Sequence, residues 1–186
     1  RGTSIRAAAK TETLAECTAS YFDRNYRHFC SHLQTPSSGK VYQPAVVKNA
    51  SVIYFCHPIF STYDINVPVW CKQVFLNVLR LLLPEPLVRH NGPSFIVTTL
   101  NRQPEQNRYV LHLLNYIPEQ RGQKIAVVED TLDTDNVSVS VRVDQKPTSV
   151  KTAPDGQTLP FTVKDGRVEF VVPRIRGHQM VSIEQS

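Results

Sequence analysis

The segment from Val52 to Leu83 constrains the fold more than any other part of the chain. It opens with a continuous apolar run over residues 52–56, which is typical of a strand covered on both faces, as in a parallel sheet. Residues 67–83 continue with the periodicity of a helix, which Pro84 cannot extend. The segment therefore predicts a strand and a long helix from an α/β layer.

The predicted helix carries a single polar stripe. Gln73, Asn77 and Arg80 follow one another at spacings of four and three residues, and Lys72 lies beside them on the same face. Asn66 is placed to cap the first turn. We expect the remaining faces of this helix to be covered by other parts of the protein.

After Pro86 the helical pattern gives way to short alternating segments. Residues 137–143 show it most clearly, with valine at every odd position and polar residues between. Asp165-Gly166 is a two-residue hairpin signal and Pro154-Asp155-Gly156 is a second turn. The expected strands are 95–100, 109–117, 124–129, 137–143, 149–152, 159–163, 168–172 and 179–183. Strands at this spacing predict an antiparallel β-sandwich.

Two domains follow, residues 1–88 and residues 89–186, with the boundary near 87–93. Within the first domain we expect short strands at 4–9, 13–17 and 44–47, and a short helix starting near Asp23 or Asn25. A turn at Asn49-Ala50 should lead into the strand at 52–56 as a hairpin or as adjacent strands.

Composition excludes several functional classes. No apolar run is long enough to cross a membrane. Residues 1–93 hold 10 Lys/Arg and 5 Asp/Glu, whereas residues 94–186 hold 11 of each, and the basic residues are too scattered for a nucleic-acid site. The four cysteines lack paired spacing, which favours reduced thiols and a reducing, cytoplasmic compartment. The first residues lack a start methionine and a signal sequence, so we expect the C-terminal piece of a longer protein.

Three histidines are candidates for a site. His28 and His32 are four residues apart, so on a helix both rings would point to one side and could share a metal, or contact a ligand or a neighbouring domain. No third ligand is evident, and two hydrogen-bonded structural histidines explain the pair equally well. We therefore predict no metal and no cofactor.

His57 follows the predicted buried strand, at the edge where open α/β sheets place their sites. His57-Pro58 resembles the His-Pro-Glu that ends the catalytic triad of class I glutamine amidotransferases. Here the third residue is Ile59, which can neither orient nor stabilise an imidazole. We expect no catalysis by this layer, unless a Cys, Asp or Glu side chain lies within hydrogen-bond reach of the His57 ring.

The second domain offers few catalytic candidates. Glu129, Asp130, Asp133 and Asp135 form an acidic cluster that could bind calcium or be a solvated loop. Nothing marks the paired carboxylates of a glycosidase. The domain has no tryptophan, and most of its aromatic residues follow the strand alternation expected of a core.

Several segments resemble the C-terminal part of bacterial glycoside-hydrolase-like proteins related to the family 42 β-galactosidases. The resembling segments are residues 21–24, 28–32, 52–60, 82–88, 108–118 and 177–180. In that family a trimerisation domain with an amidotransferase-like fold is followed by further domains. The resemblance implies the C-terminal portion of a flavodoxin- or amidotransferase-like α/β domain, and then the sandwich.

The resemblance further implies a catalytic (β/α)8 barrel upstream, which would hold both carboxylates and act on a carbohydrate. It also implies a homo-oligomer, such as a trimer, formed through the α/β domain. The expected function is non-catalytic support of that barrel. The alternatives are a carbohydrate-binding module and an amidotransferase-like or metal-dependent hydrolase.

Overall fold

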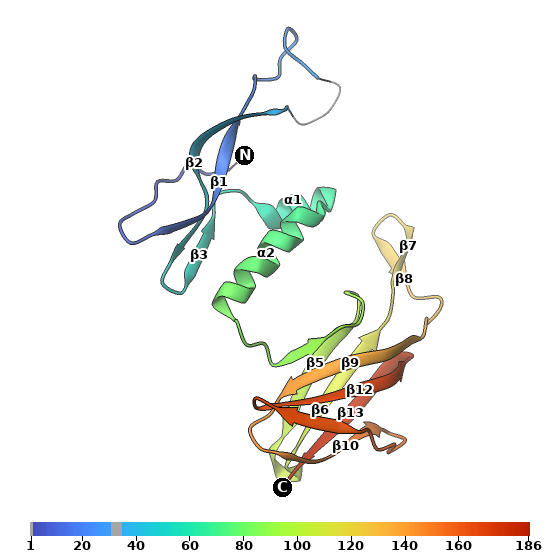
Figure 1. The fold of residues 1–186 in the computed structure, drawn as a ribbon. Coiled ribbons are helices and arrows are strands. Elements are labelled where there is room, and N and C mark those ends of the chain that lie inside the picture. The colour runs from blue at the N-terminus through green and yellow to red at the C-terminus, as the bar shows by residue number, and fades with distance from the viewer. Residues whose placement is uncertain (1, 31–34) are drawn as a thin grey trace. The chain divides into compact units, whose positions relative to one another are not determined.

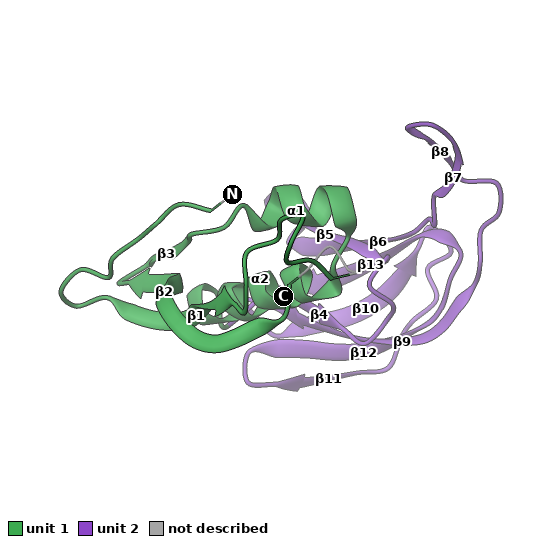
Figure 2. Ribbon diagram, turned by 90° about the horizontal axis from the view of Figure 1, so that it is seen from above, with its two compact units in different colours: residues 1–84 green, residues 85–186 purple. Residues whose placement is uncertain are grey.

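A computed structural model describes residues 2–30 and 35–186. The chain forms two compact units, residues 1–84 and residues 85–186 (Figure 2). No sheet is shared between the two units among the described residues, and each unit is described by itself.

Unit 1 contains a three-stranded antiparallel sheet in the order β1-β2-β3, followed by two helices (Figure 1). The elements are β1 (Glu12–Ser20), β2 (Ser37–Asn49), β3 (Val52–Phe55), α1 (Ile59–Asn66) and α2 (Val69–Leu82). The central strand β2 places Gln43 opposite Cys17 of β1 and Val46 opposite Phe55 of β3. The expected hairpin between β2 and β3 is confirmed, and it turns at Ala50, which adopts a left-handed backbone with φ of 50°.

The parallel, doubly covered strand predicted at 52–56 is wrong. β3 is the edge strand of the sheet and pairs antiparallel with β2, and its Val52 and Tyr54 side chains are exposed. A short apolar run fits either kind of strand, because its periodicity does not report how many faces are covered. An amidotransferase-like α/β layer is therefore not shown by this unit.

The predicted single helix is in fact two helices. Asn66 is the last residue of α1 instead of the cap of α2, and Val67 reverses the chain with φ of 47° before Pro68 leads into α2. The polar stripe is confirmed as exposed, and Gln73 Nε2 donates to Asn77 Oδ1 at 2.9 Å.

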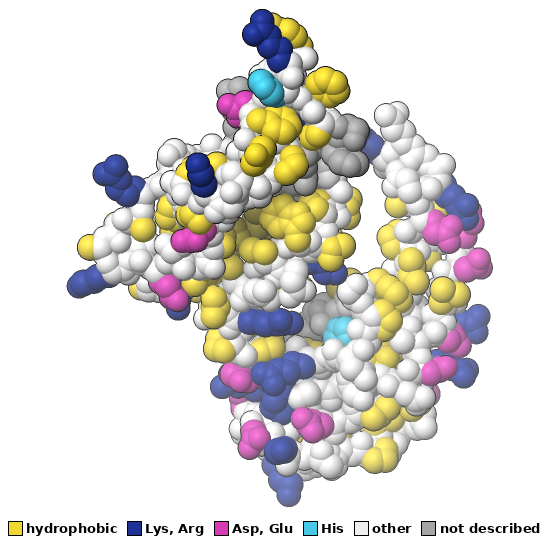
Figure 3. Space-filling model, turned by 45° about the horizontal axis from the view of Figure 1, so that its top comes forward, with side chains coloured by type: hydrophobic (Ala, Val, Ile, Leu, Met, Phe, Trp, Pro, Cys, Tyr) yellow, Lys and Arg dark blue, Asp and Glu magenta, His cyan; other side chains and the backbone are white. Residues whose placement is uncertain are grey.

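The other faces of α2 are not all covered. Cys71 and Val78 are its buried residues, but Trp70 is 55% exposed and Leu81 is exposed as well. The expectation of a helix buried outside its polar stripe is thus wrong. Exposed hydrophobic side chains occupy broad areas of the face shown in Figure 3.

Two further expectations in unit 1 differ from the structure. Residues 2–8 form no strand, and residues 21–30 form bends instead of a helix. The side chain of Asn25 explains the second difference, because its Oδ1 accepts hydrogen bonds from the backbone N–H groups of Arg27 and His28. Such local bonds replace helical ones.

Unit 2 is an antiparallel β-sandwich, as predicted. Its two four-stranded sheets have the orders β10-β13-β6-β5 and β11-β12-β9-β4, and β7 and β8 form a separate hairpin. The strands are β4 (Val88–His90), β5 (Val97–Gln103), β6 (Arg108–Asn115), β7 (Glu119–Gly122), β8 (Ile125–Val127), β9 (Thr134–Arg142), β10 (Pro147–Ala153), β11 (Phe161–Lys164), β12 (Arg167–Ile175) and β13 (Gly177–Gln185). A 3₁₀ turn, Pro104–Gln106, joins β5 and β6.

The core of unit 2 follows the period-two pattern of its strands. Val137, Val139 and Val141 of β9 are all buried, and Leu111, Leu113 and Ile183 from the opposite sheet are fully buried too. The hairpin at Asp165-Gly166 is confirmed: both residues have positive φ, and Lys164 pairs with Arg167 across it. The sequence did not predict β4, which lies inside the expected boundary region.

Buried polar groups hold the ends of this sandwich. The Arg167 guanidinium is buried and donates to the carbonyl oxygens of Pro86, Leu87 and Ser140, so it fixes the first residues of unit 2 against β9 and β12. Asn115 Nδ2 donates to the carbonyl oxygens of Leu132 and Ile175.

Among the helices of the described residues, none combines the length and the apolar character needed to cross a bilayer.

Candidate functional site

Three potential metal-ligating side chains converge in unit 1, from Cys17, Cys56 and His57. Cys17 Sγ lies 3.6 Å from Cys56 Sγ and 3.3 Å from His57 Nε2. The three donor atoms all lie within 4.8 Å of one another, and within the described residues this is the one such group of three His, Cys, Asp or Glu side chains. We call these residues the Cys₂His cluster.

The sheet of unit 1 creates the cluster. Cys17 is the buried residue of β1, whereas Cys56 and His57 follow directly after β3, on the other side of the central strand. The backbone of Cys56 is held on both sides, since its N–H donates to Ala45 O at 2.9 Å and its carbonyl accepts from Thr3 N at 2.7 Å. Both cysteines are nearly buried, with exposures of 8% and 3%, and His57 is exposed.

Neighbouring residues leave the cluster open on the His57 side. His57 lines a surface cavity of about 790 Å³ together with Arg6, Tyr42 and Gln43. Gly2 passes so close to the imidazole that a Cβ there would lie 2.2 Å from His57 Nδ1. The absence of a side chain at residue 2 is therefore what allows this packing.

The pKa of the Cys56 thiol is raised above its ordinary value. Burial raises its pKa first, and hydrogen bonding to Cys17 raises it further. Partial desolvation, followed by the charge and hydrogen bond of Cys17, raises the pKa of the Tyr42 phenol. A raised pKa disfavours the thiolate, which is the reactive form of cysteine.

Catalysis by His57 would need a Cys, Asp or Glu side chain within hydrogen-bond reach of its ring, and this requirement is met in part. Cys17 lies within hydrogen-bond reach of its ring, which brings a Cys–His pair together as the hydrolase alternative requires. In the described residues, however, no carboxylate contacts the His57 ring to orient it. A dyad without an orienting third group is an incomplete acyl-transfer site.

The structure describes only one of the two histidines in the predicted pair of His28 and His32. His28 is exposed, lies in a bend instead of a helix, and packs its ring 6.1 Å from that of Phe22. His32 lies outside the described residues. The i, i+4 argument loses its basis, because it assumed a helix over these positions.

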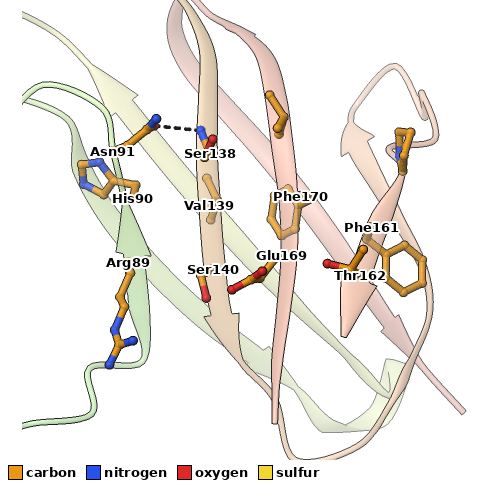
Figure 4. A pocket seen from close by; sticks show the side chains of 12 residues that line it. Arg89, His90, Asn91, Ser138, Val139, Ser140, Phe161, Thr162, Glu169 and Phe170 are labelled. Carbon is orange, nitrogen blue, oxygen red and sulfur yellow. Dashed lines mark hydrogen bonds between the residues drawn. The ribbon is translucent and has the colours of Figure 1, made fainter. Parts of the chain in front are cut away.

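A second concave surface lies on the sandwich, on the sheet containing β4, β9, β12 and β11 (Figure 4). Its volume is about 710 Å³. Cross-strand pairing places Arg89 opposite Ser140, Ser140 opposite Glu169, and Glu169 opposite Thr162. Because directly paired residues of adjacent strands point to the same face, these four side chains form a polar row across the sheet.

Other residues that line the cavity lie beside this polar row. Asn91 Oδ1 accepts a hydrogen bond from the Ser138 N–H at 2.9 Å (Figure 4), and Asn91 N donates to Ser138 O. Phe161 borders the row at β11 and is only partly exposed. Glu169 is the single acidic side chain among the described residues that line this cavity.

Arginine side chains pair with Glu129, Asp133 and Asp135 of the acidic cluster in the second unit. Arg174 pairs with Asp133 at 3.4 Å and with Asp135 at 3.0 Å, and Arg121 pairs with Glu129. These contacts favour the solvated-loop interpretation over a calcium site, because the carboxylate oxygens already face guanidinium groups. The aromatic prediction holds in part, since Tyr109 and Phe170 are buried in the core whereas Phe95 and Tyr116 are exposed.

No protein-family model and no curated protein matches this chain. Among solved structures, α-L-fucosidase isoenzyme 2 from Paenibacillus thiaminolyticus is 32% identical and superposes with a TM-score of 0.88 over 95% of this chain. A cycloisomaltooligosaccharide glucanotransferase from Paenibacillus sp. is 20% identical over 52% of this chain and 16% of its own, with a TM-score of 0.42, which is too low to support an argument.

This chain spans 27% of the length of the fucosidase. The likeness covers both units and shows that the chain is related to part of a glycoside hydrolase. It supports the glycoside-hydrolase side of the resemblance drawn from the sequence. The β-galactosidase trimerisation domain is not confirmed by it.

Proposed function

We propose that this chain is an accessory, non-catalytic region of a glycoside hydrolase that supports a catalytic (β/α)8 barrel elsewhere in the same protein. The observation that carries the proposal is the likeness of both units together to about a quarter of an α-L-fucosidase. Fold alone does not define a reaction, so the chemistry must be argued from the sites that the chain contains.

Those sites lack the groups that glycoside hydrolysis needs. Both retaining and inverting enzymes generally place two carboxyl groups across the scissile bond. The cavity on the sandwich has one, Glu169, and the cavity beside His57 has none among the described residues. The sugar recognised by the whole protein is proposed to be an α-L-fucoside, after the fucosidase, with a β-galactoside as the alternative.

The test is an activity assay of the purified chain on nitrophenyl α-L-fucoside and nitrophenyl β-galactoside. The expected result is no release of nitrophenol above the buffer rate. Turnover that a Glu169→Gln substitution abolishes would contradict the proposal. An equal residual rate in Glu169→Gln and in Glu105→Gln, which changes an exposed acid outside the cavities, would identify a contaminating enzyme.

We further propose that unit 1 mediates contacts with other subunits or with the catalytic domain. The support is its exposed apolar surface: Phe60, Ile65 and Val69 are 60%, 75% and 77% exposed. Surfaces of this kind mark protein–protein interaction sites. Sedimentation of the chain should show a concentration-dependent oligomer that Val69→Lys and Ile65→Lys dissociate, whereas Ser61→Lys on α1 should leave it intact. A monomer at all concentrations would contradict the subunit contact.

Carbohydrate binding by the sandwich is the second candidate function. The polar row of Arg89, Ser140, Glu169 and Thr162 offers hydrogen-bond donors and acceptors in one line, beside the edge of Phe161. Such a surface suits hydroxyl groups, although it lacks the flat exposed ring of a typical sugar platform. Calorimetric titration with L-fucose and galactose tests it, and Glu169→Ala should remove any binding that Glu105→Ala retains.

A further inference from the structure

We propose that Cys17, Cys56 and His57 bind a zinc ion with three protein ligands and one open coordination position. The proposal does not depend on the role of the chain in a glycoside hydrolase. It rests on the distances, the burial and the placement of these three side chains.

Two of the three separations between the donor atoms fit a tetrahedral zinc ion. Zinc bonds of about 2.3 Å to sulfur and about 2.0–2.1 Å to nitrogen separate two sulfur ligands by about 3.8 Å, and a sulfur and a nitrogen ligand by about 3.5 Å. The observed separations are 3.6 Å between the two Sγ atoms and 3.3 Å between Cys17 Sγ and His57 Nε2. These two separations are close to the edge lengths of a zinc tetrahedron, and the third pair of donor atoms, from Cys56 and His57, lies within 4.8 Å.

The chemistry of the donors selects the ion. Two thiols and an imidazole are soft or borderline ligands, which favour zinc over magnesium or calcium. The two sulfurs are 3.6 Å apart, whereas a disulfide needs about 2.05 Å, so the pair is not joined by a covalent bond. Nearly complete burial of Cys17 and Cys56 excludes solvent from two of the ligands.

The position of the cluster explains what the ion would do for the fold. Cys17 belongs to β1, and Cys56 and His57 follow β3, so the ion would join the two outer strands of a small sheet. Such a sheet, with much exposed apolar surface around it, gains stability from a metal clip. The open position faces the cavity lined by Arg6, Tyr42 and Gln43, where solvent or a small anion can complete the coordination.

The test uses the whole chain, purified with a reductant and stripped with a chelator, and then titrated with Zn²⁺ and separately with Co²⁺. We expect one zinc per chain by competition with a chromophoric chelator. Cobalt should give a thiolate-to-metal charge-transfer band and intense tetrahedral d–d bands. Cys17→Ala, Cys56→Ala and His57→Gln should each weaken binding by at least about 100-fold.

Matched controls separate ligation from general loss of structure. Cys71→Ala changes another buried cysteine and His28→Gln another exposed histidine, and both should bind zinc as the unchanged chain does. If the cysteine variants do not fold, as judged by circular dichroism, the exposed position of His57 keeps His57→Gln informative. Its cobalt spectrum must lose intensity or shift.

Three results would overturn the proposal. The first is the absence of stoichiometric zinc binding by the folded, reduced chain. The second is a cobalt spectrum that His57→Gln leaves unchanged, or that Cys71→Ala alters as much as Cys56→Ala does. The third is an intact mass that shows a disulfide between Cys17 and Cys56 under the same reducing conditions, because those thiols would then be unable to bind the ion.

Discussion

Nε2 of His57 lies 3.3 Å from Sγ of Cys17, although 40 residues separate them in the sequence. β1 and β3 both pair with the central strand β2, and Cys17 lies opposite Gln43 in the β1–β2 register. This arrangement brings Cys17 to the residues that follow β3. A slip of one residue in that register would turn Cys17 to the other face of the sheet. The register of unit 1 and the geometry of the Cys₂His cluster therefore depend on each other.

Replacing Arg167 should destabilise unit 2. Arg167→Met removes the guanidinium hydrogen bonds to the carbonyl oxygens of Pro86, Leu87 and Ser140, although Leu87 O keeps its bond from Arg142 N. We expect the free energy of unfolding to fall by about 2–4 kcal/mol. Arg142, its exposed cross-strand neighbour, is the matched control, and Arg142→Met should change stability by less than about 0.5 kcal/mol. Urea unfolding followed by circular dichroism measures both, and equal effects would show that the buried guanidinium does not support the sandwich.

Asn115 should be a second buried polar side chain that stabilises unit 2. Its Nδ2 donates to Leu132 O at 2.6 Å and to Ile175 O at 3.1 Å, so Asn115→Ala strands two acceptors and should cost about 2 kcal/mol. Asn101, an exposed asparagine of the same sheet, is the control, and Asn101→Ala should be nearly neutral. A neutral Asn115→Ala in urea unfolding would mean that water replaces the amide.

Replacing Gly166 tests how much backbone strain a side chain would introduce in the turn between β11 and β12. Its φ is +71° and no atom lies within 4 Å of the position that a Cβ would take, so Gly166→Ala should cost about 1 kcal/mol through backbone strain alone. Gly122 lacks a positive φ, and its Cβ would make an ordinary contact of 3.7 Å with Ile125, so Gly122→Ala should not carry this penalty. Thermal unfolding of the two variants makes the comparison, and equal losses would exclude the proposed strain.

Tyr109 should make unit 2 less stable in alkaline solution. Burial raises the pKa of its phenol above the ordinary value of about 10, and the hydrogen bond and charge of Asp144 add to the increase. The folded state holds the proton more tightly than the unfolded state, so this stabilisation is complete below pH 10 and is lost as pH rises through the folded pKa. Urea midpoints at several pH values above 9 measure the loss.

Tyr109→Phe is the control for that alkaline dependence. Without the phenol this contribution should disappear, and the midpoint should fall less steeply with pH than in the unchanged chain. Asp144→Asn should reduce the dependence in part, because burial remains while the negative charge does not. An identical pH profile for Tyr109→Phe would assign the alkaline loss to other groups.

The sandwich could be predicted from the sequence because its signals are local. The alternation from Val137 to Val143 and the turn at Asp165-Gly166 report directly on burial and on chain reversal. β4 could not be predicted, since three residues, Val88–His90, are too few to show a period. The register that aligns Arg89 with Ser140 and Glu169 is a long-range property, and no local pattern contains it.

Unit 1 was harder to predict for the same physical reason. The run ending at Cys56 reads equally well as a central or an edge strand, and Val67 is a β-branched residue in a left-handed conformation that sequence patterns do not anticipate. His57 was identified as a candidate from its place after a strand. Its actual neighbour, Cys17, could not be, because the sequence does not state which strands adjoin. The adjacent Cys56-His57 pair was the one local signal for the Cys₂His cluster.

Trp70 gives this two-unit chain a built-in optical label. It is the single tryptophan of the sequence, it is about half exposed on α2, and unit 2 has none. Selectively excited indole fluorescence therefore reports the unfolding of unit 1 alone, because the sandwich has no tryptophan to contribute to the signal. One denaturation series, read by indole emission and by far-ultraviolet dichroism, can reveal whether the two halves come apart in one step or in two.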